Sequence, residues 1–550
     1  MGDWADTVFV GGTVFSAPAE GPSALGVAVR GGRIAAIGPD EDLRDLVGPT
    51  TEVVDLAGGL LLPGFQDAHI HPVAGGVELL RCDLHATTSA SEAVARVASY
   101  AEGHPELEWV VGGGWSLAHY PNGTPTKELL DAVIPDRPVF LTNRDGHGAW
   151  VNSRGLELAG IGPSTPDPVD GRIERAADGS PTGTLHEGAA LLVSRLLPPV
   201  TTREQVAGLL AAQELLFSLG ITSWQDAAVG ELFGLTDMFP AYLAAAGEGL
   251  LRARVVGALW WDRERGGEQV GELEERRAVG QVGRFRASSV KIMQDGVAEN
   301  FTAGMLEPYL DSCGRVTGNA GLSFVDPGAL KEHVVDLDAR GFQVHFHALG
   351  DRAVREALDA VQAAREVNGP SGGRHHLAHL QVVHPEDVSR FARLGAVANI
   401  QPLWAAHEPQ MDELTIPFLG TRRASWQYPF GDLVRSGARV AAGSDWSVSS
   451  PNPLEGIHVA VNRVSAGAEG AEAEPLGPEQ ALSLAQALTA YTAGSAFVNG
   501  QEEATGRIGV GRLADLVVLD RDPFDHPSRE IADTQVVATY IDGDLVHHRA

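Results

Sequence analysis

The sequence predicts an α/β fold built on a (β/α)8 TIM-type barrel, and three observations lead to this prediction. Several short apolar runs have the length of buried strands. Each of the most informative runs ends in a histidine, lysine or aspartate, and helical patterns such as residues 204–219 and 351–367 fill the gaps between runs. Because the carboxyl ends of the strands in such a barrel share one mouth, these polar residues would meet there.

The first of these runs, residues 61–71, carries the most informative motif of the chain. It passes through Pro63 and Gly64 and ends at His69 and His71. Side chains two residues apart on a strand point to the same side, so both imidazoles can approach one metal ion. A His-x-His pair on an exposed strand without a metal would be the alternative if this motif stood alone.

Four later runs repeat the signal in an order that suits a single fold. They contain Lys291, His347, His379 and Asp445, at residues 289–296, 342–347, 375–379 and 439–445. Further apolar runs at residues 221–226, 254–261 and 397–401 complete a set of eight barrel strands.

These motifs resemble the amidohydrolase superfamily, which has His-x-His on strand 1, lysine on strand 4, histidines on strands 5 and 6, and aspartate on strand 8. The closer resemblance is to the branch called amidohydrolase family 3, which includes N-substituted formamide deformylase. It covers essentially the whole chain and is carried by residues 291–304, 347–354 and 443–448, with support from residues 145–152, 183–187 and 487–492.

The resemblance implies a metal site with a divalent ion as cofactor, zinc being favoured, and one or two ions per chain. The implied ligands are His69, His71, Lys291, His347, His379 and Asp445. The first two histidines and Asp445 would bind one ion, and His347 and His379 a second. Since a protonated ammonium cannot bind a metal, the resemblance implies that Lys291 is carboxylated and bridges both ions. A single ion beside an unmodified Lys291 is the alternative.

Further residues receive roles around this site. Asp445 would act as ligand and as base, taking a proton from water and passing it to the departing nitrogen. His147, in the Asp-Gly-His-Gly segment 145–148, is a candidate for stabilising the oxyanion or holding the substrate, or else a packing residue of a lid. Asp295 would either orient a ligand histidine or cap a loop. The neighbouring histidines His345, His375 and His376 are left outside the ligand set, the last two as solvent-facing residues or as residues behind the ligands.

The resemblance also divides the chain into three parts. Residues 1–62 and 495–550 would form one composite β-sandwich, because strand-like runs at both chain ends match the family's paired termini. Residues 63–73 and 201–494 would form the barrel. Residues 74–200 are too long for a βα loop and are predicted to be an inserted lid subdomain over the active site, with strands near 109–115 and 138–142.

Composition limits the classes of partner. A formal net charge of −31 argues against nucleic acid and anionic membranes, both of which need a basic protein surface. The two cysteines, Cys82 and Cys313, exclude a disulfide framework and suit a cytoplasmic protein with reduced thiols. A small-molecule substrate is therefore expected, and the resemblance implies a homodimer.

The predicted function is hydrolysis of a non-peptide C–N bond in small N-substituted, formamide-like amides, by attack of a metal-activated hydroxide. Hydrolysis of an ester, carbamate or cyclic amide at the same metal site is the alternative. A nucleobase deaminase would need His-x-x-Glu after strand 5, where residues 347–351 are His-Ala-Leu-Gly-Asp instead. A degenerate, non-catalytic scaffold would have lost ligands, whereas every ligand position is filled here.

Overall fold

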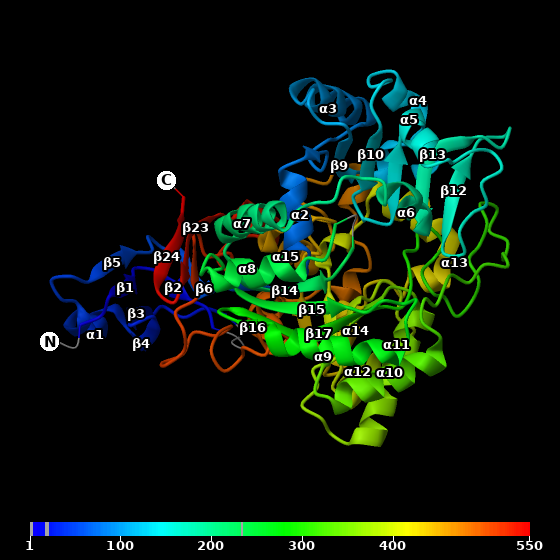
Figure 1. Cartoon of the computed structure of the whole chain (residues 1–550). Helices are drawn as coiled ribbons and strands as arrows, with labels where there is room; N and C mark the ends of the chain where they lie inside the picture. Colours follow the sequence, from blue (N-terminus) through cyan, green and yellow to red (C-terminus); the bar gives the residue numbers. More distant parts are fainter. Residues whose placement is uncertain (1–3, 17–20, 233–234, 550) are drawn as a thin grey trace.

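A barrel of eight parallel strands lies at the centre of the computed structural model, which describes residues 4–16, 21–232 and 235–549 (Figure 1). Neighbours in the barrel follow the order of the sequence: β7 (Phe65–Ile70), β14 (Ile221–Val229), β15 (Arg254–Trp260), β17 (Phe285–Met293), β18 (Gln343–Ala348), β19 (His376–His379), β20 (Val397–Ile400) and β21 (Arg439–Ala442). The short β16 (Gln281–Val282) pairs with the start of β17. The predicted fold class is confirmed. Residues 1–3, 17–20, 233–234 and 550, which fall in the predicted sandwich and barrel ranges, lie outside the described residues.

The barrel closes just beyond β21, where the backbone N–H of Asp445 donates a hydrogen bond of 2.7 Å to the carbonyl oxygen of His69. Helices cover the outside and bury a continuous apolar core against the strands. They are α2 (Pro72–Leu79), α7 (Thr202–Ser218), α8 (Phe239–Gly247), α9 (Val270–Val279), α10 (Pro327–Ala339), α11 (Asp351–Asn368), α12 (Pro385–Leu394), α13 (Ile416–Ala424), α14 (Phe430–Arg435), α15 (Pro453–Asn462), α16 (Leu484–Thr489) and α17 (Ser495–Val498).

The prediction of one strand over residues 61–71 was wrong at Gly64. The strand β6 (Leu60–Pro63) pairs with a C-terminal strand outside the barrel, and β7 begins at Phe65. A Cβ atom at position 64 would lie 2.4 Å from Oγ1 of Thr222, so only glycine allows the chain to pass between the two sheets here. The histidine motif is therefore covalently continuous with the neighbouring sandwich.

Two further sheets lie on the left of Figure 1, and the second of them combines strands from both ends of the chain. One contains β1 (Thr7–Val10), β3 (Gly26–Arg30), β4 (Arg33–Gly38) and β5 (Glu52–Asp55). The other contains β2 (Thr13–Val14), β6, β22 (Leu516–Leu519), β23 (Val536–Ile541) and β24 (Asp544–His548). Apolar residues of both sheets, such as Phe9 and Tyr540, share one core.

A six-stranded sheet is inserted between the first two barrel strands and occupies the upper right of Figure 1. Its strands are β8 (Cys82–Asp83), β9 (Val110–Trp115), β10 (Val139–Asn143), β11 (Gly148–Val151), β12 (Gly171–Arg175) and β13 (Pro181–Glu187). Its helices are α3 (Ala90–Gly103), α4 (Lys127–Asp131), α5 (Ser153–Leu158) and α6 (Gly188–Ser194). The chain leaves the barrel along α2 and returns along α7, and a Cβ on Gly76 would lie 1.9 Å from the carbonyl oxygen of Gly208. The two helices thus meet backbone to backbone.

The structure contains no disulfide between the two cysteines and no membrane-spanning helix among the described residues. Cys82 and Cys313 are both free thiols, the first buried and the second exposed. Within the described ranges, no helix combines the length and the apolar character that crossing a bilayer requires.

Candidate active site

The six predicted ligands all lie at the carboxyl end of the barrel. His69, Lys291, His347 and His379 belong to β7, β17, β18 and β19, and His71 and Asp445 follow β7 and β21. Each is buried, with exposures between 1% and 7%. They line one cavity of about 1490 Å³ together with residues of the insert.

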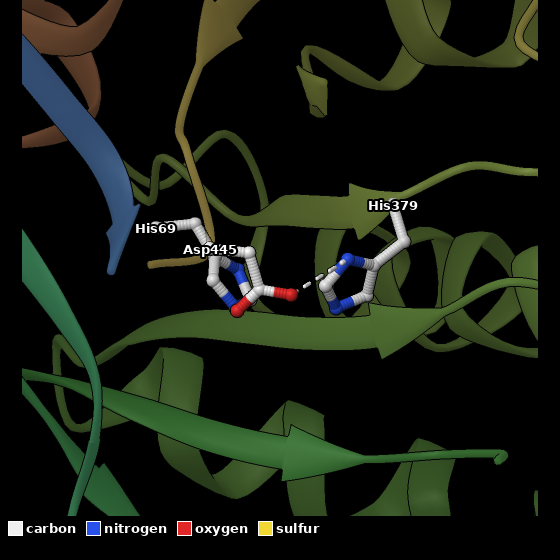
Figure 2. Close-up of side chains that lie close together, drawn as sticks. All are labelled: His69, His379 and Asp445. Carbon is white, nitrogen blue, oxygen red and sulfur yellow. Dashed lines mark ion pairs between the residues drawn. The ribbon is translucent and has the colours of Figure 1, made fainter. Parts of the chain in front are cut away.

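Asp445 is the point on which three histidines converge. Its Oδ1 lies 3.0 Å from Nε2 of His71 and 3.2 Å from Nε2 of His69, and its Oδ2 lies 3.8 Å from Nδ1 of His379. Figure 2 shows the carboxylate between the rings of His69 and His379, whose ligand atoms and those of Asp445 lie within 4.8 Å of one another. Both His379 and Asp445 have left-handed backbone, with φ of 80° and 57°. Such conformations are uncommon outside glycine and are often found at functional sites.

The protonation of these groups suits a cation. Burial lowers the pKa of His69, His347 and His379 well below the usual histidine value, and nearby positive groups add to the effect. Burial alone would raise the pKa of Asp445, but the hydrogen bond from His71 and the neighbouring His379 lower it. Neither ring nitrogen of His379 has a hydrogen-bond partner among the described residues. Neutral imidazoles around a carboxylate, with buried ring nitrogens that have no hydrogen-bond partner, form a set of ligand atoms that fits a divalent metal.

Lys291 lies in the same layer of the barrel. Burial lowers the pKa of its ammonium group to about 7, although the carboxylates of Asp445 and Asp226 oppose the shift. Near neutral pH a large fraction of the Lys291 side chains therefore carries the neutral amine, which is the form that can react with carbon dioxide.

Asp295 makes the contacts that both of the roles considered for it require. Its Oδ1 lies 3.1 Å from Nδ1 of His347, which leaves Nε2 of that ring for other partners. Its carboxylate also accepts hydrogen bonds from the backbone N–H groups of Gly304 and Gly350, both at 2.9 Å. Burial raises the pKa of Asp295 to about 7 against these hydrogen bonds. The residue therefore holds two loops together behind His347.

His147 reaches the site from the insert, and its partner Glu187 ends the 183–187 motif, which by itself gave this residue no role. Its Nδ1 lies 3.0 and 3.1 Å from the two carboxylate oxygens of Glu187, the last residue of β13. The His147 and His347 rings are 5.7 Å apart. Burial alone would lower the pKa of His147, but Glu187, Asp145 and Asp445 raise it to about 9. Glu187 has φ 50° and ψ −129°, a strained backbone for a residue with a side chain.

The histidines left outside the ligand set are not solvent-facing. His375 and His376 are 1% and 0% exposed, so that interpretation was wrong. His345, also 0% exposed, has its Nε2 2.8 Å from Nδ1 of His69. The spacing of two residues between His345 and His347 already indicated that both point into the barrel.

Several aromatic and apolar side chains form part of the cavity wall. Trp404 stacks on the ring of His379 at 5.2 Å with an angle of 14° between the planes. Trp446, Leu403 and Met411 also line the cavity. These side chains offer an apolar surface beside the candidate ligands.

Comparison with known proteins agrees with this geometry. A model of the amidohydrolase family matches residues 52–547. Protein LONG AFTER FAR-RED 3 of Arabidopsis thaliana is 30% identical over 554 residues, 99% of this chain and 92% of that protein. N-substituted formamide deformylase of Arthrobacter pascens is 28% identical over 571 residues, 100% of this chain and 99% of that protein. The structure of an uncharacterised metal-dependent hydrolase from Pyrococcus furiosus superposes with a TM-score of 0.71 at 26% identity, covering 94% of this chain and 99% of the other. With its barrel, its histidine motif and a match over nearly its whole length, the chain belongs to the amidohydrolase family.

Proposed function

We propose that this chain is a metal-dependent hydrolase that cleaves the C–N bond of small N-substituted amides, with N-substituted formamides as the first candidates. The convergence of three histidines, His69, His71 and His379, on the Asp445 carboxylate, in a cavity lined in part by apolar side chains, carries the proposal. The substrate class is supported by the full-length relative named N-substituted formamide deformylase.

We propose zinc as the cofactor, because a mixed set of imidazole and carboxylate ligands suits this ion. His69, His71 and Asp445 would hold one ion, and His347 and His379, with a carboxylated Lys291, a second. A bound divalent ion polarises a carbonyl group and lowers the pKa of water to about 7, so that water can attack at neutral pH.

The reaction needs one proton to move from water to nitrogen. The attacking water adds its oxygen to the carbonyl carbon, and the carboxylate of Asp445 accepts the released proton. Asp445 then delivers the proton to the amide nitrogen as the C–N bond breaks, because an unprotonated amide anion is too basic to leave. An N-substituted formamide and water thereby give an amine and formic acid.

His147 would act from the part of the cavity wall that the insert forms. The Glu187 carboxylate accepts the Nδ1–H and stabilises the protonated ring. Nε2–H of this ring could then donate to the carbonyl oxygen as negative charge develops on it. The inserted subdomain would in this way supply part of the catalytic machinery as well as a cover.

Replacing His147 by asparagine is expected to lower kcat by about 10²–10³-fold, the usual cost of losing one donor to an oxyanion. Glu187→Gln is expected to cost about 10-fold, the rate equivalent of about 1.5 kcal/mol in a hydrogen bond to a charged group. Steady-state kinetics on the metal-loaded protein measures both. His186→Asn is the matched control, since this buried histidine is next to Glu187 but contacts Glu174 at 3.1 Å instead. A loss in the control equal to that in His147→Asn would contradict the role of His147.

The function is tested by measuring the metal content of the purified protein together with formate and amine release from N-benzylformamide. Bound metal with stoichiometric release of both products would support the proposal. If the protein binds metal but does not hydrolyse N-benzylformamide, and instead hydrolyses an ester, carbamate or cyclic amide, the activity belongs to that substrate class. A chain that binds no metal after reconstitution with bicarbonate would be a scaffold, and the catalytic proposal would be wrong.

A further inference from the structure

A layer of polar side chains fills the barrel beneath the candidate metal site. Its members are Gln225, Gln343, His345, His376, Asn399 and Gln401. All of them except the partly buried Gln343 are at most 1% exposed. Buried polar groups of this kind are stable only when each donor faces an acceptor, so the positions of their hydrogens follow from their partners.

One chain of hydrogen bonds starts from two backbone carbonyl groups. Nε2 of Gln343 donates to the carbonyl oxygens of Arg374 and Val498, both at 2.8 Å. Because carbonyl oxygens only accept, the orientation of this amide is set, and its Oε1 faces Gln225. That oxygen accepts from Nε2 of Gln225 at 3.1 Å, so Oε1 of Gln225 faces the histidines.

A second chain starts from a backbone donor and leads to the same orientation. The N–H of His379 donates to Oε1 of Gln401 at 2.7 Å, and Nε2 of Gln401 donates to Oδ1 of Asn399 at 3.1 Å. Nδ2 of Asn399 therefore donates to Nδ1 of His376 at 3.0 Å. His376 is 0% exposed and its hydrogen-bond partners are two neutral amides, so burial keeps its ring neutral. The ring then carries its hydrogen on Nε2 and donates it to Oε1 of Gln225 at 3.0 Å. Both series of hydrogen bonds require Oε1 of Gln225 to face the two histidines.

The hydrogen on His345 follows from this oxygen. Nδ1 of His345 lies 2.8 Å from Oε1 of Gln225 and must donate to it. His345 is also 0% exposed and contacts an amide and an imidazole, so burial keeps its ring neutral. Its Nε2 is then an acceptor, and Nδ1 of His69, at 2.8 Å, must be its donor. The remaining nitrogen of His69, Nε2, carries no hydrogen and faces Oδ1 of Asp445 at 3.2 Å.

We infer that His345 and Gln225 are positioning residues that hold His69 in the tautomer whose Nε2 lone pair faces the metal position. A bare nitrogen and a carboxylate oxygen at this distance repel each other unless a cation lies between them. The polar layer thus prepares a cation site before any ion binds, since a ligand histidine is oriented by the partner of its other nitrogen. The purpose that we assign to this tautomer rests on the proposed metal-dependent function. The tautomer itself is a property of the metal-free protein.

The first test measures zinc affinity of the metal-free protein by competition with a chelator, and the absorption spectrum of the cobalt(II) form. His345→Phe is expected to weaken the tighter zinc site by about 10–100-fold and to change the cobalt spectrum. His345→Gln should restore most of the affinity, because its amide can donate to Gln225 and accept from His69 in the same directions. Unchanged affinity in His345→Phe would overturn the inference.

His375→Phe is the matched control. His375 is equally buried, but it accepts from the N–H of Val344 and contacts Asp338 of α10, outside the polar layer. It is expected to lower the melting temperature without changing zinc affinity. Equal losses of affinity in His345→Phe and His375→Phe would indicate general destabilisation and contradict the positioning role.

The second test separates this inference from the proposed function. Nitrogen-15 spectra of the metal-free, histidine-labelled chain, with the His69 signals identified by comparison with His69→Gln, report which ring nitrogen carries hydrogen. The inference requires hydrogen on Nδ1, and hydrogen on Nε2 would overturn it. If the wild-type chain bound no metal, the proposed function would fail, while this spectrum would still decide the tautomer.

Discussion

Replacing Asp445 by asparagine is expected to reduce kcat/KM by at least about 1,000-fold, because general acid–base catalysis alone contributes about 10²–10⁴-fold. Asparagine has nearly the same shape, but it lacks the charge toward which His69, His71 and His379 converge. It also cannot carry a proton from water to nitrogen. Metal content and steady-state kinetics on the same preparation would show whether the ion, the turnover or both are lost.

Asp515→Asn is the control for losing a buried carboxylate. Asp515 is 3% exposed and accepts from Nε of Arg254 at 2.8 Å, at the junction of barrel and sandwich. This variant is expected to melt at a lower temperature while the folded enzyme keeps its kcat/KM. Turnover retained in Asp445→Asn would mean that another group moves the proton.

Replacing Lys291 by methionine is expected to lower the metal content and to reduce kcat by at least about 100-fold, since even partners behind the ligands contribute about 10–100-fold. The neutral amine of a buried lysine with a pKa of about 7 can take up carbon dioxide near neutral pH. Wild-type metal uptake should therefore increase with added bicarbonate, and the methionine variant should lose this dependence. Titration of the metal-free proteins with zinc at several bicarbonate concentrations measures the effect.

Lys331→Met serves as the comparison, because Lys331 is only half-buried and its Nζ lies 3.5 Å from Asp359 on the outside of the barrel. It should bind metal as the wild type does. A wild-type chain that takes up one ion independently of bicarbonate would instead support the mononuclear alternative, with an unmodified Lys291.

Much of the barrel could be predicted because its signals are local. A buried strand reads as an apolar run, and a ligand at its end interrupts that run, so positions such as His69 and Asp445 are visible in the sequence. The change of sheet at Gly64 was not visible, because β6 and β7 are both fully buried strands that follow each other directly in the chain. Their separation depends on the close approach of Thr222. Local pattern does not report a contact with a strand far along the chain.

The residues behind the ligands were harder to find for a related reason. Glu187 lies 40 positions from His147, and their contact exists only because β11 and β13 pair in the inserted sheet. Gln225 is a neutral amide in the middle of a strand, a residue type with no distinctive spacing. His345 could have been found, since it alternates with His347, but its contact with His69 depends on the curvature of the barrel.

Because α2 and α7 are in close contact, the inserted segment can be exchanged as a single unit. It leaves and re-enters the barrel where Gly76 touches Gly208, so its two ends are neighbours and its replacement would place little strain on the strands below. His147 and Glu187 both belong to this segment, whereas the candidate ligands belong to the barrel and its loops. A single exchange of contiguous sequence can therefore change the cavity wall together with His147, the proposed hydrogen-bond donor to the oxyanion, while the candidate ligands stay in place.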